Sequence, residues 1–255
     1  MVLSMQRWIG KIAIVTGASS GIGAAIADHL VEKGLIVVGL ARRSERIEKR
    51  SKALDGKKGK LYAVRTDMSK EEEILRAFQW VESNLGHVHI LINNAAVLKE
   101  SYLHEGKTED WRATLDVNVL GLCTATREAF KIMRANGISG HIININSLIG
   151  HKLANIPIFN VYSASKYAVG ALSGILRQEL DNLNSKIKVT SLSPGLVSTE
   201  MTDLNPENSA ERIHLLNSLP MIKADDIADA VDYVLSTPEN VQIQELIITP
   251  IGEKL

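Results

Sequence analysis

The stretch Thr16-Gly17-Ala18-Ser19-Ser20-Gly21-Ile22-Gly23 decides the fold class of this chain. It follows a short apolar run at 11–16 and precedes apolar residues at helical spacing. Gly17 allows a sharp turn off the strand, Gly21 allows the backbone to approach a pyrophosphate, and Gly23 allows the helix to pack against the sheet. Free N–H groups at the start of that helix suit a phosphate. The stretch therefore indicates a dinucleotide-binding turn, with a purely structural turn as the alternative.

Beyond this turn, short apolar runs alternate with amphipathic segments along the whole chain. Continuous apolar strands between helices are typical of a parallel sheet covered on both faces. The pattern predicts one doubly wound α/β domain over 1–255. The expected strands are 11–16, 35–41, 61–66, 88–92, 141–145, 187–192 and 245–249. The expected helices include 22–31, 70–85, 108–135, 161–183 and 224–235.

The composition argues against several classes of partner. The 255 residues are 45% apolar and 23% charged, and 29 basic residues balance 29 acidic ones. A neutral chain argues against nucleic acid or an anionic membrane as a partner. Cys123 is the only cysteine, so an internal disulfide is excluded and we expect no metal. No apolar run approaches the roughly twenty residues of a membrane span, and 1–9 lacks a signal-peptide core, so we expect a cytoplasmic protein.

Two regions stand outside the alternating pattern. The run 42–60 is rich in Lys and Arg, and a solvated helix and turn explains most of it. It lacks the interleaved aromatic residues of a nucleic-acid surface. Residues 196–223 contain Pro206 and Pro220 and show little periodicity. We therefore expect a substrate loop or lid there, with one short helix.

The end of the second expected strand carries the residues that would select the cofactor. Dinucleotide sites for NAD place an acid there, which binds the ribose 2′-hydroxyl. The stretch Leu40-Ala41-Arg42-Arg43 has two guanidinium groups and no acid, and Arg42 could hold a 2′-phosphate. Charge-assisted bonds contribute about 1.5–3 kcal/mol each, which is about one to two decades of preference. We therefore predict NADP(H) over NAD(H); the alternative is two solvated arginines at the start of a helix.

Tyr162 and Lys166 lie four positions apart in a segment of helical character, which places them on one helix face. The pKa of a free tyrosine is about 10, so a tyrosine base near neutral pH needs about 4 kcal/mol of help. A cation about 4 Å away at an effective dielectric of about 20 supplies that amount. The pair is therefore a candidate acid/base with its perturbing cation, although the spacing alone is common on helices.

Ser147 strengthens this interpretation because it follows the apolar run 141–145. It should therefore lie at the carboxyl end of a parallel strand, where open α/β sheets bind ligands. From there its hydroxyl could polarise a substrate carbonyl while Tyr162 transfers the proton. Asn118 is an amide within an otherwise apolar helical segment. It is either a link in a proton path from Lys166 to solvent or a buried capping or water-binding residue.

Further candidate motifs join those above, and the full set is Thr16-Gly17-x-x-x-Gly21-x-Gly23, Asp67, Asn93-Asn94-Ala95, Asn118, Ser147, Tyr162-x-x-x-Lys166 and Pro194-Gly195 with Thr199. In combination and in this order, these motifs resemble those of the short-chain dehydrogenase/reductase family, over essentially the whole chain. Stretches such as 39–43 and 142–147 resemble one NADP-dependent subgroup more closely, which includes insect farnesol dehydrogenases and a vertebrate reductase of ketosteroids and other carbonyls. The chain departs from the family at Ala96, often glycine, and at Asn146, often serine.

The resemblance implies a seven-stranded Rossmann sheet in the order 3-2-1-4-5-6-7 and hydride transfer between nicotinamide and a carbonyl or alcohol carbon. It implies that Tyr162 is the acid/base and that Ser147 orients the substrate oxygen. Lys166 would hold the ribose and lower the tyrosine pKa, and Asn118 would anchor a water relay. The residues then expected to bind the cofactor are Gly17, Ser19, Ser20, Gly21, Ile22, Gly23, Arg42, Arg43, Asp67, Met68, Asn94, Ala95, Tyr162, Lys166, Pro194, Gly195, Val197 and Thr199.

The expected substrate is an apolar small-molecule alcohol or carbonyl, because the segments that could wall the pocket carry few charges. It would be a terpenoid such as farnesol, a fatty alcohol or a steroid. A general carbonyl, 3-ketosteroid or quinone reductase is the other enzymatic interpretation, and a catalytically silent NADP-binding regulator is one from another class. The resemblance also implies a homodimer or homotetramer built through 108–135 and 161–183. The expected substrate contacts are Leu148, Ile149, Phe159, Leu196 and Met201, which could instead simply pack the lid.

Overall fold

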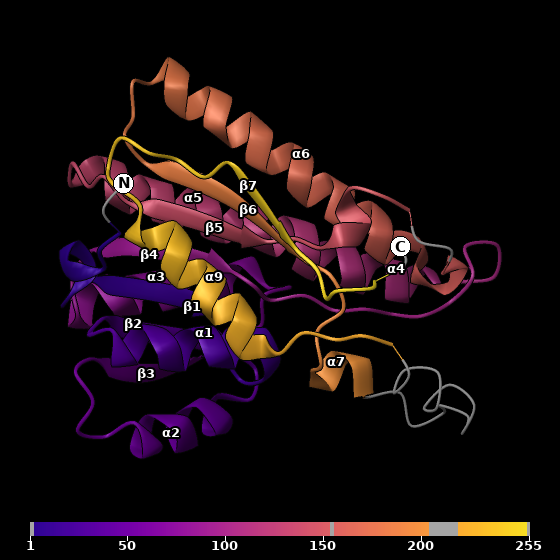
Figure 1. Cartoon of the computed structure of the whole chain (residues 1–255), viewed down its shortest axis with the longest axis horizontal. Helices are drawn as coiled ribbons and strands as arrows, with labels where there is room; N and C mark the ends of the chain where they lie inside the picture. Colours follow the sequence, from indigo (N-terminus) through magenta and orange to yellow (C-terminus); the bar gives the residue numbers. More distant parts are fainter. Residues whose placement is uncertain (1–2, 154–155, 204–218, 254–255) are drawn as a thin grey trace.

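The computed structural model describes residues 3–153, 156–203 and 219–253. Within these residues, seven strands form one parallel sheet in the order β3-β2-β1-β4-β5-β6-β7, which confirms the predicted topology (Figure 1). The strands are β1 (Ile12–Thr16), β2 (Ile36–Ala41), β3 (Lys60–Arg65), β4 (Val88–Asn93), β5 (His141–Ile145), β6 (Lys188–Pro194) and β7 (Glu245–Ile248). Each coincides closely with the apolar run that predicted it.

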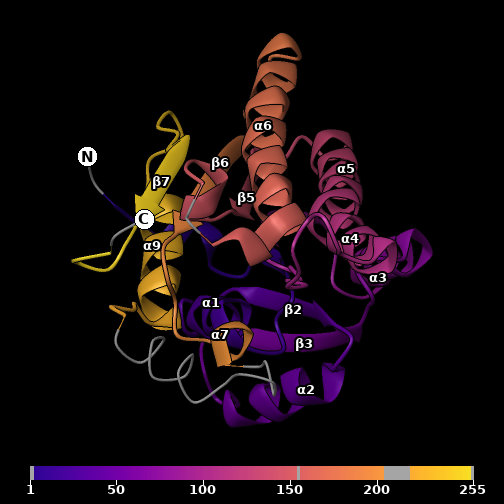
Figure 2. The same ribbon diagram turned by 90° about the vertical axis from the view of Figure 1, so that its right-hand side faces the viewer.

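Helices cover both faces of the sheet. They are α1 (Gly21–Glu32), α2 (Ser44–Ala53), α3 (Glu71–Asn84), α4 (Thr108–Leu115), α5 (Leu122–Ala135), α6 (Asn160–Asn182), α7 (Glu200–Asp203) and α9 (Ala224–Ser236). Side chains alternate along a strand, so Ala13 and Val15 of β1 join the core under α1 and α9, while Ile12 and Ile14 join the core under α3 and α5. Figures 1 and 2 show these helix groups on opposite sides of the sheet. In the described part of the chain, no helix is long and apolar enough to cross a bilayer.

The segment at 108–135, predicted as helix, contains a π-helical turn between α4 and α5. This turn, η2, spans Asp116–Gly121. Gly121 lies so close to the chain after β3 that a Cβ would come within 2.3 Å of the Met68 carbonyl oxygen. Asn118 hydrogen-bonds through its amide to the backbone of Val97. The widened turn thus coincides with two tertiary contacts that helical periodicity does not encode.

The predicted lid at 196–223 is described at its two ends, and positions 204–218 lie outside the described residues. The two ends pair through a parallel bridge between Val197 and Ile222. Ser198 N donates to the Ile222 carbonyl oxygen, and Ile222 N donates to that of Leu196, both at 3.0 Å. A Cβ on Gly21 would lie 3.3 Å from the Thr199 side chain, so this paired segment lies against the start of α1.

Candidate active site

Asn94, which follows β4, holds the turn between β1 and α1. Its amide donates to the carbonyl oxygens of Thr16 at 2.9 Å and Gly17 at 3.4 Å, and Thr16 Oγ1 accepts from its backbone N–H at 3.0 Å. Gly17 and Gly21 have φ angles of 69° and 54°, in the left-handed region that favours glycine. A Cβ on Gly23 would lie 2.3 Å from the Asn94 amide nitrogen. The three glycines therefore allow β1, α1 and the end of β4 to meet.

A cleft opens beside this turn. Ser20 is the N-cap of α1, and its side chain makes no capping hydrogen bond, so the first N–H groups of the helix have no side-chain cap. Four of the predicted cofactor residues do not line this cleft. Gly23 contacts Asn94 behind the turn, and Pro194, Gly195 and Val197 line a neighbouring cavity. The predicted cofactor residues that line the cleft are Gly17, Ser19, Ser20, Gly21, Ile22, Arg42, Arg43, Asp67, Met68, Asn94, Ala95, Tyr162, Lys166 and Thr199. Others that the sequence did not suggest include Thr66, Val97, Val117, Ile145, Asn146 and Glu200.

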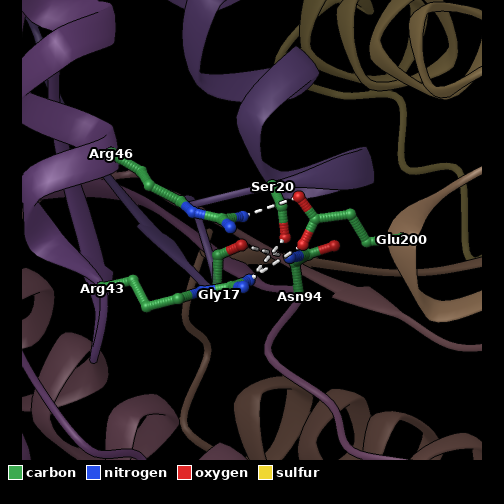
Figure 3. A network of polar contacts seen from close by, with 6 residues as sticks. All are labelled: Gly17, Ser20, Arg43, Arg46, Asn94 and Glu200. Carbon is green, nitrogen blue, oxygen red and sulfur yellow. Dashed lines mark hydrogen bonds and ion pairs between the residues drawn. The ribbon is translucent and has the colours of Figure 1, made fainter. Parts of the chain in front are cut away.

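The basic end of the cleft contains an ion-pair network (Figure 3). Arg43 donates to Ser20 Oγ at 3.1 Å and to Glu200 Oε2 at 3.2 Å, and Arg46 donates to Glu200 Oε1 at 2.6 Å. Partial burial raises the pKa of Glu200, but the hydrogen bonds and charges of Arg46 and Arg43 outweigh it and keep that pKa below its ordinary value. Glu200 is therefore a carboxylate at neutral pH.

Asp67 lies after β3 on the same cleft. Its Oδ1 accepts from the Ser69 backbone N–H at 3.0 Å and from the Ser69 hydroxyl at 2.8 Å. Burial raises the pKa of Asp67, whereas these two bonds and the charge of Arg42 lower it, and the lowering prevails. The cleft thus presents an ionised carboxylate beside the basic residues that follow β2.

Tyr162 and Lys166 lie one helical turn apart near the start of α6, and both side chains are buried. Lys166 Nζ donates to the Ile145 carbonyl oxygen at 2.9 Å and lies 5.7 Å from the centre of the Tyr162 ring. Burial raises the pKa of Tyr162 to about 12 and lowers that of Lys166 to about 8. The protein's own groups therefore keep the phenol protonated at neutral pH. The lower tyrosine pKa that base catalysis needs requires further positive charge near the phenol.

Asn118 joins the chain after β4 to the first turn of α6. Its Oδ1 accepts from the Val97 N–H at 2.8 Å, and its amide donates to the Val97 carbonyl oxygen at 3.0 Å. The amide also donates to Ser165 Oγ at 3.0 Å, and that hydroxyl donates to the Tyr162 carbonyl oxygen at 2.7 Å. Asn118 thus positions the backbone that carries Tyr162. Its role in a proton path stays a prediction.

A cavity of about 550 Å³ adjoins the cleft. Ser147 and Tyr162 both line it; Ser147 Oγ accepts from the Ile149 N–H at 3.4 Å, and Phe159 packs edge-on against the Tyr162 ring, with ring centres 6.1 Å apart. All five predicted substrate contacts line the cavity: Leu148, Ile149, Phe159, Leu196 and Met201. The cleft and the cavity share Ile22, Asn146, Tyr162, Thr199 and Met201. The two spaces therefore meet at the tyrosine.

Glu253 also reaches this cavity, although no sequence motif points to it. Its Oε1 accepts from the Leu196 N–H at 3.0 Å, and its carboxyl group lies over Gly195, where a Cβ would not fit. Burial raises the pKa of Glu253 above its ordinary value. The contact depends on β7 returning the chain to the carboxyl edge of the sheet, which no local pattern reveals.

Comparison with known proteins identifies the family. A family model described as short chain dehydrogenase matches residues 11–210, and the chain belongs to this family of oxidoreductases. The farnesol dehydrogenase of Aedes aegypti is 47% identical over 252 residues, covering 98% of this chain and 100% of the relative. Dehydrogenase/reductase SDR family member 11 of Homo sapiens is 43% identical over 253 residues, covering 96% of both. These matches confirm the predicted family and subgroup.

Two solved structures share the fold. An alcohol dehydrogenase from the archaeon Thermococcus sibiricus, complexed with 5-hydroxy-NADP, has a TM-score of 0.83 at 26% identity and covers 96% of this chain and 98% of its own. The closed form of a serine dehydrogenase complexed with NADP+ has a TM-score of 0.86 at 29% identity and covers 96% of both chains. The doubly wound α/β fold predicted from the sequence is therefore confirmed.

Proposed function

We propose that this chain transfers hydride between NADP(H) and the alcohol or carbonyl carbon of an apolar small molecule. The observation that carries the proposal is the position of Tyr162, which lines both the cleft beside the β1–α1 turn and the adjoining cavity. A nicotinamide in the cleft and a substrate in the cavity would meet at one phenol. The shared wall makes transfer between the two ligands the chemistry that the geometry supports best.

The donors and the shape of the cleft fit a dinucleotide. The turn of Gly17 and Gly21 leaves room for a pyrophosphate at the start of α1, whose first N–H groups have no side-chain cap. Arg42 and Arg43 lie at the end of β2, where the ribose 2′ position is recognised, and their charges favour a 2′-phosphate. The NADP ligands named for the two solved neighbours support the same choice.

The residues at the junction suit proton transfer coupled to hydride transfer, which a nicotinamide supplies or accepts when bound. In the direction of reduction, Tyr162 carries its proton at neutral pH and donates it to the substrate oxygen, while the Ser147 hydroxyl donates a hydrogen bond to the same oxygen. In the direction of oxidation the phenol must first lose its proton. Positive charge near the phenol would favour that loss, and Lys166 Nζ lies 5.7 Å from the ring centre on the same helix face.

The cavity supports an apolar substrate. Leucine, isoleucine, phenylalanine and methionine side chains make up much of its wall, and its volume of about 550 Å³ suits a terpenoid or fatty alcohol, or a steroid. The name of the mosquito relative, farnesol dehydrogenase, supports a terpenoid alcohol. A general reductase of ketones or quinones is the second candidate, because the name of the human relative, dehydrogenase/reductase SDR family member 11, includes reduction.

The test is steady-state turnover of terpenoid, fatty and steroid alcohols, with NADP+ and NAD+ in parallel, followed at the absorbance of the reduced nicotinamide. We expect the highest kcat/KM with NADP+ and a long apolar alcohol. The reverse reaction is assayed with NADPH and ketosteroids or quinones. A higher kcat/KM for reduction of these compounds than for oxidation of the alcohols would favour the second candidate. Better turnover of small polar sugars would contradict the apolar substrate, and tight NADPH binding without turnover of any compound would support a silent binding protein.

A further inference from the structure

The carboxylate of Glu200, at the basic end of the cleft, lies between the guanidinium groups of Arg43 and Arg46. Arg46 and Arg43 donate to its two oxygens at 2.6 and 3.2 Å, and Arg43 also donates to Ser20 Oγ at 3.1 Å (Figure 3). Two guanidinium groups beside the N-cap hydroxyl of a helix are donors of the kind that bind phosphate. A side chain of the protein itself therefore holds donors that suit a cofactor phosphate.

We infer that Glu200 competes with the cofactor 2′-phosphate for Arg43 and Arg46, and so sets how strongly the enzyme prefers NADP(H) to NAD(H). This inference rests on the proposed function, in which the dinucleotide occupies the cleft. The 2′-phosphate is the relevant group because Arg43, the N-cap of α2, lies two residues after the end of β2, and Arg46 lies in the first turn of α2. Rossmann folds recognise the ribose 2′ position at the end of the second strand.

The ion pairs are weak enough for a ligand to replace. The side chains of Glu200, Arg43 and Arg46 are 39%, 44% and 43% exposed. Ion pairs this exposed change an equilibrium by at most about fivefold each, because water and salt screen them. A phosphate dianion carries more charge and more acceptor oxygens than one carboxylate. Glu200 should therefore moderate NADP(H) affinity without abolishing it.

The test compares Glu200→Gln, which keeps the shape and removes the charge, with Glu48→Gln as the matched control. Glu48 is an exposed residue of α2, so its substitution removes an equal charge close to the same arginines. NADPH and NADH affinities are measured by fluorescence titration, and 2′,5′-ADP and 5′-ADP affinities by calorimetry. We expect Glu200→Gln to bind NADPH and 2′,5′-ADP about three- to tenfold more tightly, with NADH and 5′-ADP changed less than about twofold. Glu48→Gln should leave the NADPH-to-NADH affinity ratio and the 2′,5′-ADP-to-5′-ADP affinity ratio near those of the unmodified protein.

Three outcomes would overturn the inference. An unchanged NADPH-to-NADH affinity ratio would show that Glu200 does not compete with the 2′-phosphate. An equal gain for both cofactors would place the competition at the pyrophosphate instead. Weaker NADPH binding by Glu200→Gln would show that Glu200 orients the arginines in favour of the ligand. The proposed cofactor fails separately, if the unmodified protein binds NADH more tightly than NADPH.

Discussion

Burial acts in opposite directions on the two ionisable groups at the centre of the site. It disfavours the charged form of each, so it raises the pKa of Tyr162 to about 12 and lowers that of Lys166 to about 8. The phenol therefore starts as a proton donor. The Lys166 ammonium donates one hydrogen bond to the Ile145 carbonyl oxygen. This bond holds the ammonium 5.7 Å from the centre of the Tyr162 ring. At the residue scale, burial therefore sets the starting protonation of both groups, and a phenolate base would need added positive charge nearby.

Replacing Tyr162 with phenylalanine removes the proton that the mechanism transfers and keeps the ring that packs against Phe159. We expect kcat for the best substrate to fall by at least about 100-fold, the usual scale of general acid–base catalysis. NADPH affinity should stay close to that of the unmodified protein, measured by fluorescence titration. Tyr167→Phe, at the exposed neighbouring tyrosine of the same helix, is the control and should leave kcat unchanged. Near-normal turnover in Tyr162→Phe would remove this residue from the chemistry.

At the scale of elements, the site depends on two junctions that clamp the carboxyl ends of the strands. Asn94 ties the end of β4 to the β1–α1 turn, and Asn118 ties the chain after β4 to α6. In both cases the side-chain amide hydrogen-bonds to backbone groups of another segment and so holds the two segments together. The catalytic tyrosine and the glycine turn are thus set relative to β4 by hydrogen bonds.

The close approach at Gly23 can be tested by adding one methyl group. In Gly23→Ala, the new Cβ would lie 2.3 Å from the Asn94 amide nitrogen and 2.5 Å from the Gly17 carbonyl oxygen. We expect unfolding in urea to show a loss of about 1–3 kcal/mol, typical of overpacking, together with weaker NADPH binding. Gly174→Ala in α6 is the control, because its Cβ would meet only the Arg177 side chain at 3.8 Å. Gly174→Ala should be at least as stable as the unmodified protein, since alanine favours helix over glycine by about 1 kcal/mol. Equal losses of stability in the two variants would contradict a specific close contact between Gly23 and Asn94.

Local pattern predicted the elements well, because inner strands such as β1 are buried on both faces and largely apolar, whereas the edge strands β3 and β7 are partly exposed. The strand order came from the family resemblance, and apolar runs alone do not encode it. The π-helical turn at Asn118 and the position of Glu200 opposite Arg43 were not predicted, since both depend on segments far apart in the sequence. The expected oligomer and cytoplasmic location stay predictions.

At the scale of the whole molecule, the amino end of the sheet is a second polar region, remote along the strands from the site. The Trp8 indole and the Arg7 guanidinium both donate to the Leu235 carbonyl oxygen, at 2.8 and 3.0 Å, and so tie the start of the chain to α9. Lys188, which begins β6, donates to the Pro238 and Val241 carbonyl oxygens at 2.6 Å each. This end of the molecule stabilises the fold, whereas the carboxyl end carries the candidate chemistry.

His141, which begins β5, makes this stabilising region sensitive to acid. Its ring is fully buried, and its Nε2 donates to Thr190 Oγ1 at 2.9 Å, because that hydroxyl gives its own proton to the Ile243 carbonyl oxygen. Burial, followed by the charges of Lys188 and Arg7, lowers the pKa of His141 to about 3. Protonation in the folded state would place a second charge beside Lys188.

The consequence is a loss of stability as pH falls below about 6.5, the pKa expected in the unfolded chain. Between that pH and about 3 only the unfolded state binds the proton, so the free energy of unfolding should fall by up to about 1.4 kcal/mol per pH unit from this group. Urea unfolding between about pH 7 and pH 5 should show a shallower slope in His141→Gln, whose amide can still donate to Thr190. His104→Gln, at an exposed histidine, should keep the original slope. Because His141 lies at the amino end of its strand, kcat of the folded His141→Gln enzyme should be unchanged, and an identical pH slope in both variants would assign the acid sensitivity elsewhere.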